Sequence, residues 1–364
     1  MFSVPAFDAG KFPEHVQGCD IGSVKRTVLP GDCLFSKLNP RINRVWVIPA
    51  PAKGIQVASP EFWPLRLKKN REVSPEYLCH FLSWEKFRET VVGREEAATK
   101  SRSRLKPSQL LSQSIPVPPL AEQIRIVAIL DVAEELRRFR EQADRRTADL
   151  IPALFHEMFG DEQAFEKKCL GDILSSIDSG WSPVCHEEPA TNEEWGVLKL
   201  GAVTTGYYLD TENKALPEVF TPRPGIEVKK GDILFTRKNT KDLVAAIAYV
   251  WHTRSKLMLS DLIFRLRLQE NVGVEPLYLT YALKNPLKRR EIQSLASGTA
   301  GSMPNISKQR LIGVMVLFPS IDLQKVFVAR VAKIRVMEEQ QAESCRRLND
   351  LYQSLLHRAF RGDL

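Results

Sequence analysis

The sequence has no long apolar run and few cysteines. No stretch approaches the roughly 18 uninterrupted apolar residues of a membrane-spanning helix, and the first residues lack the basic start and apolar core of a secretory signal. The six cysteines are scattered without a Cys-x-x-Cys pair, which argues against a zinc ribbon and against a disulfide framework. We therefore expect a cytoplasmic protein with reduced thiols and no metal site.

Sequence motifs of nucleotide and methyl-transfer chemistry are also missing. There is no Gly-x-x-x-x-Gly-Lys-Ser/Thr loop, so bound ATP is not expected. An adenine methyltransferase needs an Asn/Asp-Pro-Pro-Phe/Tyr tetrapeptide, whereas the pair Pro118-Pro119 stands between Val117 and Leu120. The chain is not expected to catalyse these reactions.

A nuclease would need clustered carboxylates that hold Mg²⁺. The nearest pattern is Glu227-Val-Lys229 with Asp210 upstream. An edge strand with a solvated lysine explains the same residues. We expect no catalytic residues here.

The length and charge indicate a folded, basic protein. At 364 residues, with 43% hydrophobic and 26% charged residues, the chain is long enough for two domains. Its net charge is +8 and its pI is near 9.1, which makes an anionic partner plausible.

The chain repeats itself at an offset of about 200 residues. GDCLFSKLNP at 31–40 aligns with GDILFTRKNT at 231–240, and SPEYLCHFL at 74–82 aligns with EPLYLTYAL at 275–283. LKPSQL at 105–110 then aligns with ISKQRL at 306–311, and ALFHEMFGD at 153–161 is echoed by SLLHRAFRGDL at 354–364. A register held over this length indicates a tandem duplication.

Each copy has a β-rich globular part followed by a long helix. Short β-type runs broken by Gly, Pro and Asn surround one short helix, and a proline-bearing hinge then leads into the helix. We place the globular parts at 1–117 and 161–318 and the helices at 118–160 and 319–364. At 1.5 Å per residue, helices of about 40 residues span roughly 60 Å.

The apolar stripes of both helices have steps of three and four residues, close to the 3.5-residue repeat of a coiled coil. We expect the two helices to pack antiparallel as a spacer, with a polar middle at Arg140 and Gln341. Ordinary core helices are the alternative. The predicted seam residues are Leu130, Ala133, Leu136, Leu150, Leu154, Val331, Ile334, Met337, Leu348, Leu351 and Leu355.

These motifs together resemble a known family. The run IPVPPLAEQIRIVAILD at 115–131, followed by ALFHEMFGD and by the closing LLHRAFRGDL, is similar to the specificity subunits of type I restriction-modification systems. GDCLFSKLNP, GDILFTRKNT and LSDLIFRLRL resemble the target recognition domains of that family. The resemblance covers essentially the whole chain.

The resemblance implies an α+β fold with a pseudo-two-fold internal repeat. Two tandem mixed α/β target recognition domains are separated by two long antiparallel helices that form a coiled coil. It also implies a non-catalytic subunit that reads a bipartite, asymmetric site in double-stranded DNA. Its partners would be two modification subunits, which methylate adenine, and restriction subunits, with S-adenosylmethionine, ATP and Mg²⁺ used only by these partners.

The first copy departs from the family pattern at its start. About sixty residues, including LGDILSSIDSGWSP, separate Cys169 from Gly231, but only thirty precede Gly31. The opening segment of a recognition domain therefore has no counterpart in copy one. We interpret this as a shortened first domain or a start that lies further upstream.

Candidate DNA contacts are basic and polar residues in loops, because phosphates attract Lys and Arg while base edges need donors and acceptors. Arg237 could bind guanine and Asn239 adenine, and Gly298 and Gly301 would allow close backbone approach. The candidates are Lys37, Asn39, Arg41, Lys100, Arg102, Arg104, Thr236, Arg237, Lys238, Asn239, Lys241, Gly298 and Gly301.

Two hypotheses remain open beside DNA recognition. A coiled-coil scaffold or decoy could bind a modification subunit without productive DNA recognition, and an autonomous nuclease would use Glu227 and its neighbours.

Overall fold

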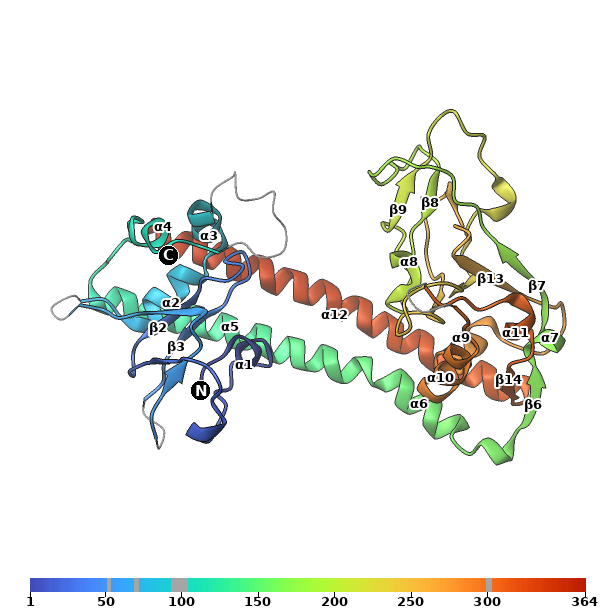
Figure 1. The fold of residues 1–364 in the computed structure, drawn as a ribbon, viewed down its shortest axis with the longest axis horizontal. Helices are drawn as coiled ribbons and strands as arrows, with labels where there is room; N and C mark the ends of the chain where they lie inside the picture. Colours follow the sequence, from blue (N-terminus) through green and yellow to red (C-terminus); the bar gives the residue numbers. More distant parts are fainter. Residues whose placement is uncertain (51–53, 69–71, 93–103, 299–302) are drawn as a thin grey trace. The chain divides into compact units, whose positions relative to one another are not determined.

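The computed structural model describes residues 1–50, 54–68, 72–92, 104–298 and 303–364 (Figure 1). The chain forms two compact units, one made of residues 1–144 and 340–364 and the other of residues 145–339. Each unit therefore contains one β-rich copy together with segments of both long helices. The structure is α+β, as expected.

The first unit is built around a small antiparallel sheet with the strand order β3-β2-β5 and a separate pair, β1-β4. The strands are β1 (Arg26–Thr27), β2 (Cys33–Ser36), β3 (Val45–Val47), β4 (Val57–Ala58) and β5 (Phe62–Leu65). The helices are α1 (Val4–Asp8), α2 (Pro75–Ser83), α3 (Glu85–Val92), α4 (Pro107–Leu111), most of α5 (Leu120–Ala148) and the end of α12 (Ile321–Arg361).

The second unit has a larger antiparallel sheet with the order β11-β10-β13-β7, and two smaller sheets, β12-β8-β9 and β14-β6. The strands are β6 (Glu166–Cys169), β7 (Leu174–Ser179), β8 (Gly196–Leu198), β9 (Asn213–Ala215), β10 (Ile233–Thr236), β11 (Ile247–Tyr249), β12 (Leu257–Met258), β13 (Ile263–Leu268) and β14 (Met315–Phe318). The helices are α6 (Leu150–Phe159), α7 (Leu170–Ile173), α8 (Gly201–Thr204), α9 (Pro276–Lys284), α10 (Pro286–Ser294), α11 (Lys308–Ile312) and the first part of α12.

The two copies share their central elements. Strands β2, β3 and β5 correspond to β10, β11 and β13, and helices α2 to α4 correspond to α9 to α11. The segment that the sequence shows only in copy two forms α7 and β7, and β7 pairs with β13. Within the part of copy one that the structure describes, no strand takes the corresponding edge of the sheet.

A buried glutamine joins each recognition part to its long helix. The side chain of Gln123 accepts a hydrogen bond from the Ser74 backbone N–H at 2.8 Å and donates to the Glu72 carbonyl at 2.7 Å. Gln324 repeats this in copy two, where it accepts from Glu275 N–H at 2.9 Å and donates to the Gly273 carbonyl at 3.1 Å. Both are fully buried, and a buried amide needs such partners.

The repeated Gly-Asp pair is a tight turn before the central strand. Gly31 and Gly231 have φ of 83° and 94°, which side chains adopt only at a cost. The carboxylate of Asp32 accepts the Leu29 backbone N–H at 2.8 Å, and that of Asp232 accepts the Lys229 N–H at 2.9 Å. The two copies therefore share a local hydrogen bond as well as the Gly-Asp sequence.

The first long helix is interrupted where the second is continuous. Helix α5 ends at Ala148 and α6 begins at Leu150, whereas α12 runs without a break over 41 residues. Pro152 lies at the start of α6, and its missing N–H cannot bond the carbonyl of Ala148. The expected single helix over 118–160 is therefore two helices.

Within each unit the helix segments pack as the sequence predicts, in opposite directions. In the first unit Arg125 donates to the Leu364 carbonyl, and Arg137 Nε donates to Asn349 Oδ1 at 2.6 Å. Residue numbers therefore rise along α5 as those of the contacting residues fall, so the two segments are antiparallel. In the second unit the rings of Phe155 and Phe159 lie 5.6 and 5.5 Å from that of Phe327.

The predicted seam is displaced over part of its length. Leu130, Ala133 and Val331 are buried, and Leu154, Ile334, Leu348 and Leu355 are partly buried. Leu136, Leu150, Met337 and Leu351 are exposed instead.

The buried positions lie one residue further along each helix. Ile151 and Phe155 are buried in the second unit, and Tyr352 and Leu356 in the first. A 3.5-residue repeat falls behind a straight α-helix of 3.6 residues per turn by about 0.6 residue over six turns. The contact face therefore advances by about one position between Leu130 and Ile151, and again between Val331 and Tyr352.

Candidate nucleic-acid interface

One edge of the large sheet in the second unit gathers polar loop residues. Strand β10 ends at Thr236, which pairs with Ile263 at the start of β13. The loop that follows runs beside the segment before α11, because the Arg237 carbonyl accepts the Ile306 N–H at 2.8 Å and Lys238 forms a β-bridge with Asn305. Two segments almost 70 residues apart thus form one surface.

Arg237 is held with its terminal nitrogens available. Its Nε donates to Asn305 Oδ1 at 3.1 Å, and the guanidinium lies 5.0 Å from the centre of the Phe264 ring. Its Nη atoms make no hydrogen bond or ion pair with any residue that the structure describes. A guanidinium fixed at one nitrogen and open at two others suits a bidentate acceptor such as a guanine edge.

Lys308 contributes a second cation to this edge. Its Nζ lies 5.6 Å from the centre of the Phe264 ring and donates to the Ile177 carbonyl at the end of β7. Phe264 therefore has Arg237 and Lys308 beside one ring, and the positive charge of this edge is concentrated there.

Two of the predicted contacts point inward. Thr236 is fully buried, and its hydroxyl accepts the Ala246 N–H at 2.9 Å. Asn239 is 6% exposed, and its amide donates to Thr204 while its oxygen accepts the Thr240 N–H at 2.8 Å. The side chains of Thr236 and Asn239 thus hold the loop in shape.

The remaining candidates of copy two lie around this loop. Lys238 is half-buried, and Lys241 and Gly298 are exposed. Gly301 lies outside the described residues.

Copy one builds the same edge with different side chains. The Lys37 carbonyl accepts the Leu105 N–H at 3.1 Å, and Leu38 forms a β-bridge with Arg104. Arg104 is exposed and pairs with Glu61 at 2.9 Å, so part of its charge is compensated.

The other candidates of copy one are less closely grouped. Asn39 is half-buried with φ of 49°, Arg41 is exposed, and the Arg41 carbonyl accepts from Arg88. Lys100 and Arg102 lie outside the described residues.

Asn305 and Lys308 also lie at this edge, although they are not among the candidates predicted from the sequence. Asn305 aligns with Arg104 at the repeat offset of 201, and Arg104 was singled out in copy one. Transferring each candidate of one copy to the other would have found it.

A buried arginine braces the strands beneath this edge. Arg265 is 2% exposed; it donates to Asp178 at 2.8 and 2.9 Å, to Asp232 at 3.2 Å and to the Glu227 carbonyl at 2.7 Å. Burial alone would raise the pKa of Asp178, but hydrogen bonds from Arg267 and Arg265 hold that pKa below its usual value. Asp178 is therefore ionised at neutral pH and pairs with both arginines.

The residues considered for a nuclease do not form a metal site. Glu227 Oε1 accepts the Lys256 backbone N–H at 2.7 Å, which gives it a structural contact. Across the described part of the chain, no group of three or more His, Cys, Asp or Glu side chains could hold a metal ion. No helix in that part is long and apolar enough to cross a membrane.

Residues 21–142 match the model described as the type I restriction modification DNA specificity domain.

Curated relatives have the same description. The chain is 36% identical over 206 residues to the specificity subunit of the type I restriction enzyme EcoEI of Escherichia coli, which covers 55% of this chain and 34% of that protein. It is 23% identical over 320 residues to the EcoKI specificity subunit of Escherichia coli K12, which covers 82% of this chain and 67% of that protein. The chain thus spans about one third of the first relative and two thirds of the second.

Solved structures share the fold. A chain from a type I restriction-modification assembly superposes with a TM-score of 0.59 at 19% identity, over 100% of this chain and 91% of that one. The S subunit of a type I system from M. genitalium gives a TM-score of 0.53 at 16% identity, over 92% and 84%.

Proposed function

We propose that the chain is the non-catalytic DNA-recognition subunit of a type I restriction-modification system, because residues 21–142 match the DNA specificity domain of such systems and the chain is similar to their specificity subunits. It reads a bipartite, asymmetric site in double-stranded DNA, one half with each recognition part. Two modification subunits and the restriction subunits supply the chemistry, together with S-adenosylmethionine, ATP and Mg²⁺.

The observation that supports this proposal is the repeated loop edge. In both copies the loop after the central strand bonds the segment before the third short helix through the same backbone contacts. The side chains on this shared frame differ: Arg237 and Asn305 in copy two stand where copy one has Lys37 and Arg104. Two recognition parts that share these backbone contacts but have different side chains suit the recognition of two different DNA sequences.

The long helices support a fixed distance between the two half-sites. DNA repeats every 34 Å or so, and reading two halves of one site requires both readers on matching faces of the duplex. We propose that the long helices, each joined to a recognition part by a buried glutamine, serve as this spacer.

The proposal is tested by mapping adenine methylation in the host genome before and after deletion of the gene. We expect a bipartite methylated motif to disappear on deletion and to return with a plasmid copy. An unchanged methylome contradicts the proposal. Loss of methylation without sequence-selective DNA binding by the assembled complex would favour the scaffold hypothesis instead.

A further inference from the structure

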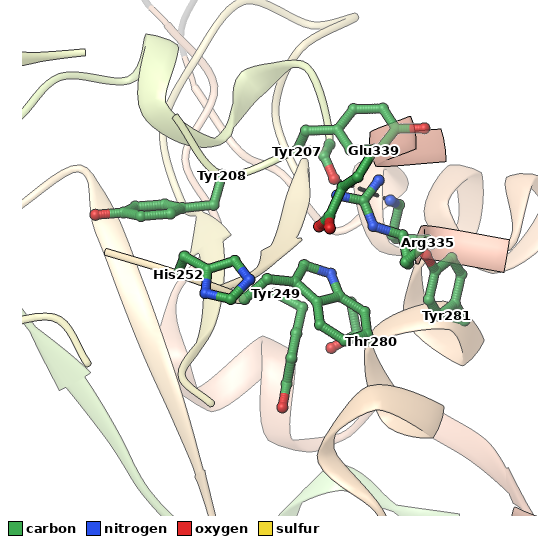
Figure 2. A pocket seen from close by; sticks show the side chains of 11 residues that line it. Tyr207, Tyr208, Tyr249, His252, Thr280, Tyr281, Arg335 and Glu339 are labelled. Atoms are coloured by element: carbon green, nitrogen blue, oxygen red, sulfur yellow. Dashed lines mark hydrogen bonds between the residues drawn. The ribbon is translucent and has the colours of Figure 1, made fainter. Parts of the chain in front are cut away.

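The second unit contains a pocket with a volume of about 130 Å³, away from any assigned role (Figure 2). Its walls come from the turn after α8, the end of β11, helix α9 and helix α12. Aromatic side chains form most of the wall, and Lys284 and Arg335 bring two cations to it. Figure 2 shows Arg335 and Glu339 on the side formed by α12, facing Tyr207 and the residues of β11.

Lys284 has few partners for a buried ammonium group. Its Nζ donates to the Gly206 carbonyl at 2.9 Å, and no ion pair among the described residues includes it. Burial, together with the nearby charge of Arg335, lowers the pKa of Lys284 to about 8. An ammonium group has three donors, so two remain for another acceptor.

Arg335 and its neighbours add further unused donors. Arg335 Nη1 pairs with Glu338 at 2.5 Å, but its Nε is buried without a hydrogen-bond partner among the described residues. The Trp251 ring nitrogen and the Tyr281 hydroxyl are two further polar groups among the residues that line the pocket. A pocket rich in unused donors suits a ligand rich in acceptors.

The aromatic walls restrict the shape of such a ligand. Lys284 Nζ lies 5.0 Å from the ring centre of Tyr207 and 5.1 Å from that of Tyr281. The Arg335 guanidinium lies 5.4 Å from the ring centre of Tyr207 and 5.7 Å from that of Trp251. Rings and cations that alternate in this way accommodate a flat apolar body with an anionic end.

Copy one has carboxylates at two matching positions of its long helix. There Asp131 accepts from His80 at 2.8 Å and Glu134 accepts from Lys11 at 2.8 Å. At the repeat offset of 201, Asp131 becomes Ala332 and Glu134 becomes Arg335. Copy two has therefore lost both carboxylates at these positions and gained a cation.

We propose that this pocket binds a carboxylate carried on a flat apolar body, with Lys284 and Arg335 as the residues that bind the carboxylate. The carboxylate takes the role that Asp131 and Glu134 have in copy one. It comes either from a free aromatic acid or from an acidic side chain of a partner polypeptide. The proposal does not depend on DNA recognition.

Glu339 gives the proposal a sensitive test, because it lines the pocket with a negative charge. Its side chain opposes an anionic ligand, so Glu339→Gln should tighten binding. A gain of affinity cannot result from misfolding.

The probe is 4-fluorobenzoate, and its binding to the full-length protein is measured by the broadening of its ¹⁹F NMR line. The neutral isostere 4-fluorobenzamide should bind at least about tenfold more weakly. Lys284→Met should weaken 4-fluorobenzoate binding about tenfold, and Glu339→Gln should strengthen it about threefold. Lys288→Met, on the neighbouring helix α10, is the matched control and should change nothing.

Competition identifies the source of the carboxylate. Displacement of the probe by a peptide that contains Glu beside Phe, with both termini blocked, assigns the site to a partner polypeptide. Displacement by free aromatic acids alone assigns it to a small molecule. Equal binding of the benzamide, unchanged binding in Lys284→Met, or equal displacement by inorganic phosphate overturns the proposal.

Discussion

Under the proposed function, Arg237 is our candidate for reading a base, since its Nε donates to Asn305 and its Nη atoms make no hydrogen bond with any residue that the structure describes. We expect Arg237→Ala to weaken binding of the assembled complex by about 10- to 100-fold, and only for DNA with the half-site read by copy two. The measurement is fluorescence anisotropy with duplexes in which one half-site at a time is scrambled.

The control for this variant is Arg290→Ala, an exposed arginine on α10. It should leave both half-sites unaffected. A uniform loss of affinity for every duplex in Arg237→Ala would show a phosphate contact and contradict base reading.

The sequence predicts the residue types in this loop better than the orientation of their side chains. Arg237 and Lys238 were found because basic residues in a loop suit DNA. The inward orientation of Thr236 depends on Ala246, 10 residues away in sequence, and that of Asn239 on Thr204, 35 residues away. Such contacts are set by tertiary packing, so no local pattern shows them.

His80 makes the stability of the first unit depend on pH. It is buried, with Nε2 at 2.8 Å from Asp131 and Nδ1 at 3.3 Å from Tyr352. Burial alone would lower the pKa of His80, but the hydrogen bond to Asp131 and the nearby Cys79 and Glu134 raise it overall. The charged form is therefore favoured in the folded state.

The sign of the effect follows from this raised pKa. The stabilisation is fully present below 6.5, the ordinary histidine pKa, and is lost as the pH rises through the higher folded value. We expect His80→Gln to remove about 1 kcal/mol at low pH and nearly nothing at high pH, since Asp131 is largely exposed. Urea denaturation of both proteins between about pH 6 and 9 measures the difference, and parallel curves would refute the assignment.

At the scale of the element, the helices show which leucines form the contact. Leu356 is 0% exposed and Leu351 is 50% exposed on the same helix. We expect Leu356→Ala to lower the free energy of unfolding by about 3 kcal/mol and Leu351→Ala by less than about 1 kcal/mol. Chemical denaturation of the full chain compares these two substitutions. Equal losses of unfolding free energy would instead support the contact residues that the 3.5-residue repeat predicts.

The starts of the two long helices lie near their expected positions, whereas the break in the first helix and the contact face were not predicted. The helices begin at Leu120 and Ile321, two residues after the expected 118 and 319, because proline hinges mark these positions. The contact face advances by one residue only over six turns. Apolar residues spaced three and four apart therefore cannot distinguish a repeat of 3.5 residues from one of 3.6 residues.

At the scale of the whole molecule, most of the predicted fold followed from the internal duplication. It indicated two recognition parts and two helices, and the structure repeats the central strands and short helices of each. The sequence repeat did not reveal the role of the first nine residues, although the structure gives them a counterpart in copy two: Phe2 bridges Ala58 in parallel as β8 pairs with β12, and α1 follows as α8 does. Phe2 and Ala6 there pack into a small core, with the ring of Phe2 at 4.8 Å from that of Trp46.

The glutamine joints have an evolutionary consequence. The side chains of Gln123 and Gln324 form hydrogen bonds with backbone groups of the recognition parts, so these bonds do not depend on which side chains those parts have. Recombination between copies, or with a related gene, would preserve the joint while it exchanged the reader attached to it. Under the proposed function, such an exchange would change the DNA sequence that is selected in a single genetic event and leave the long helices unchanged.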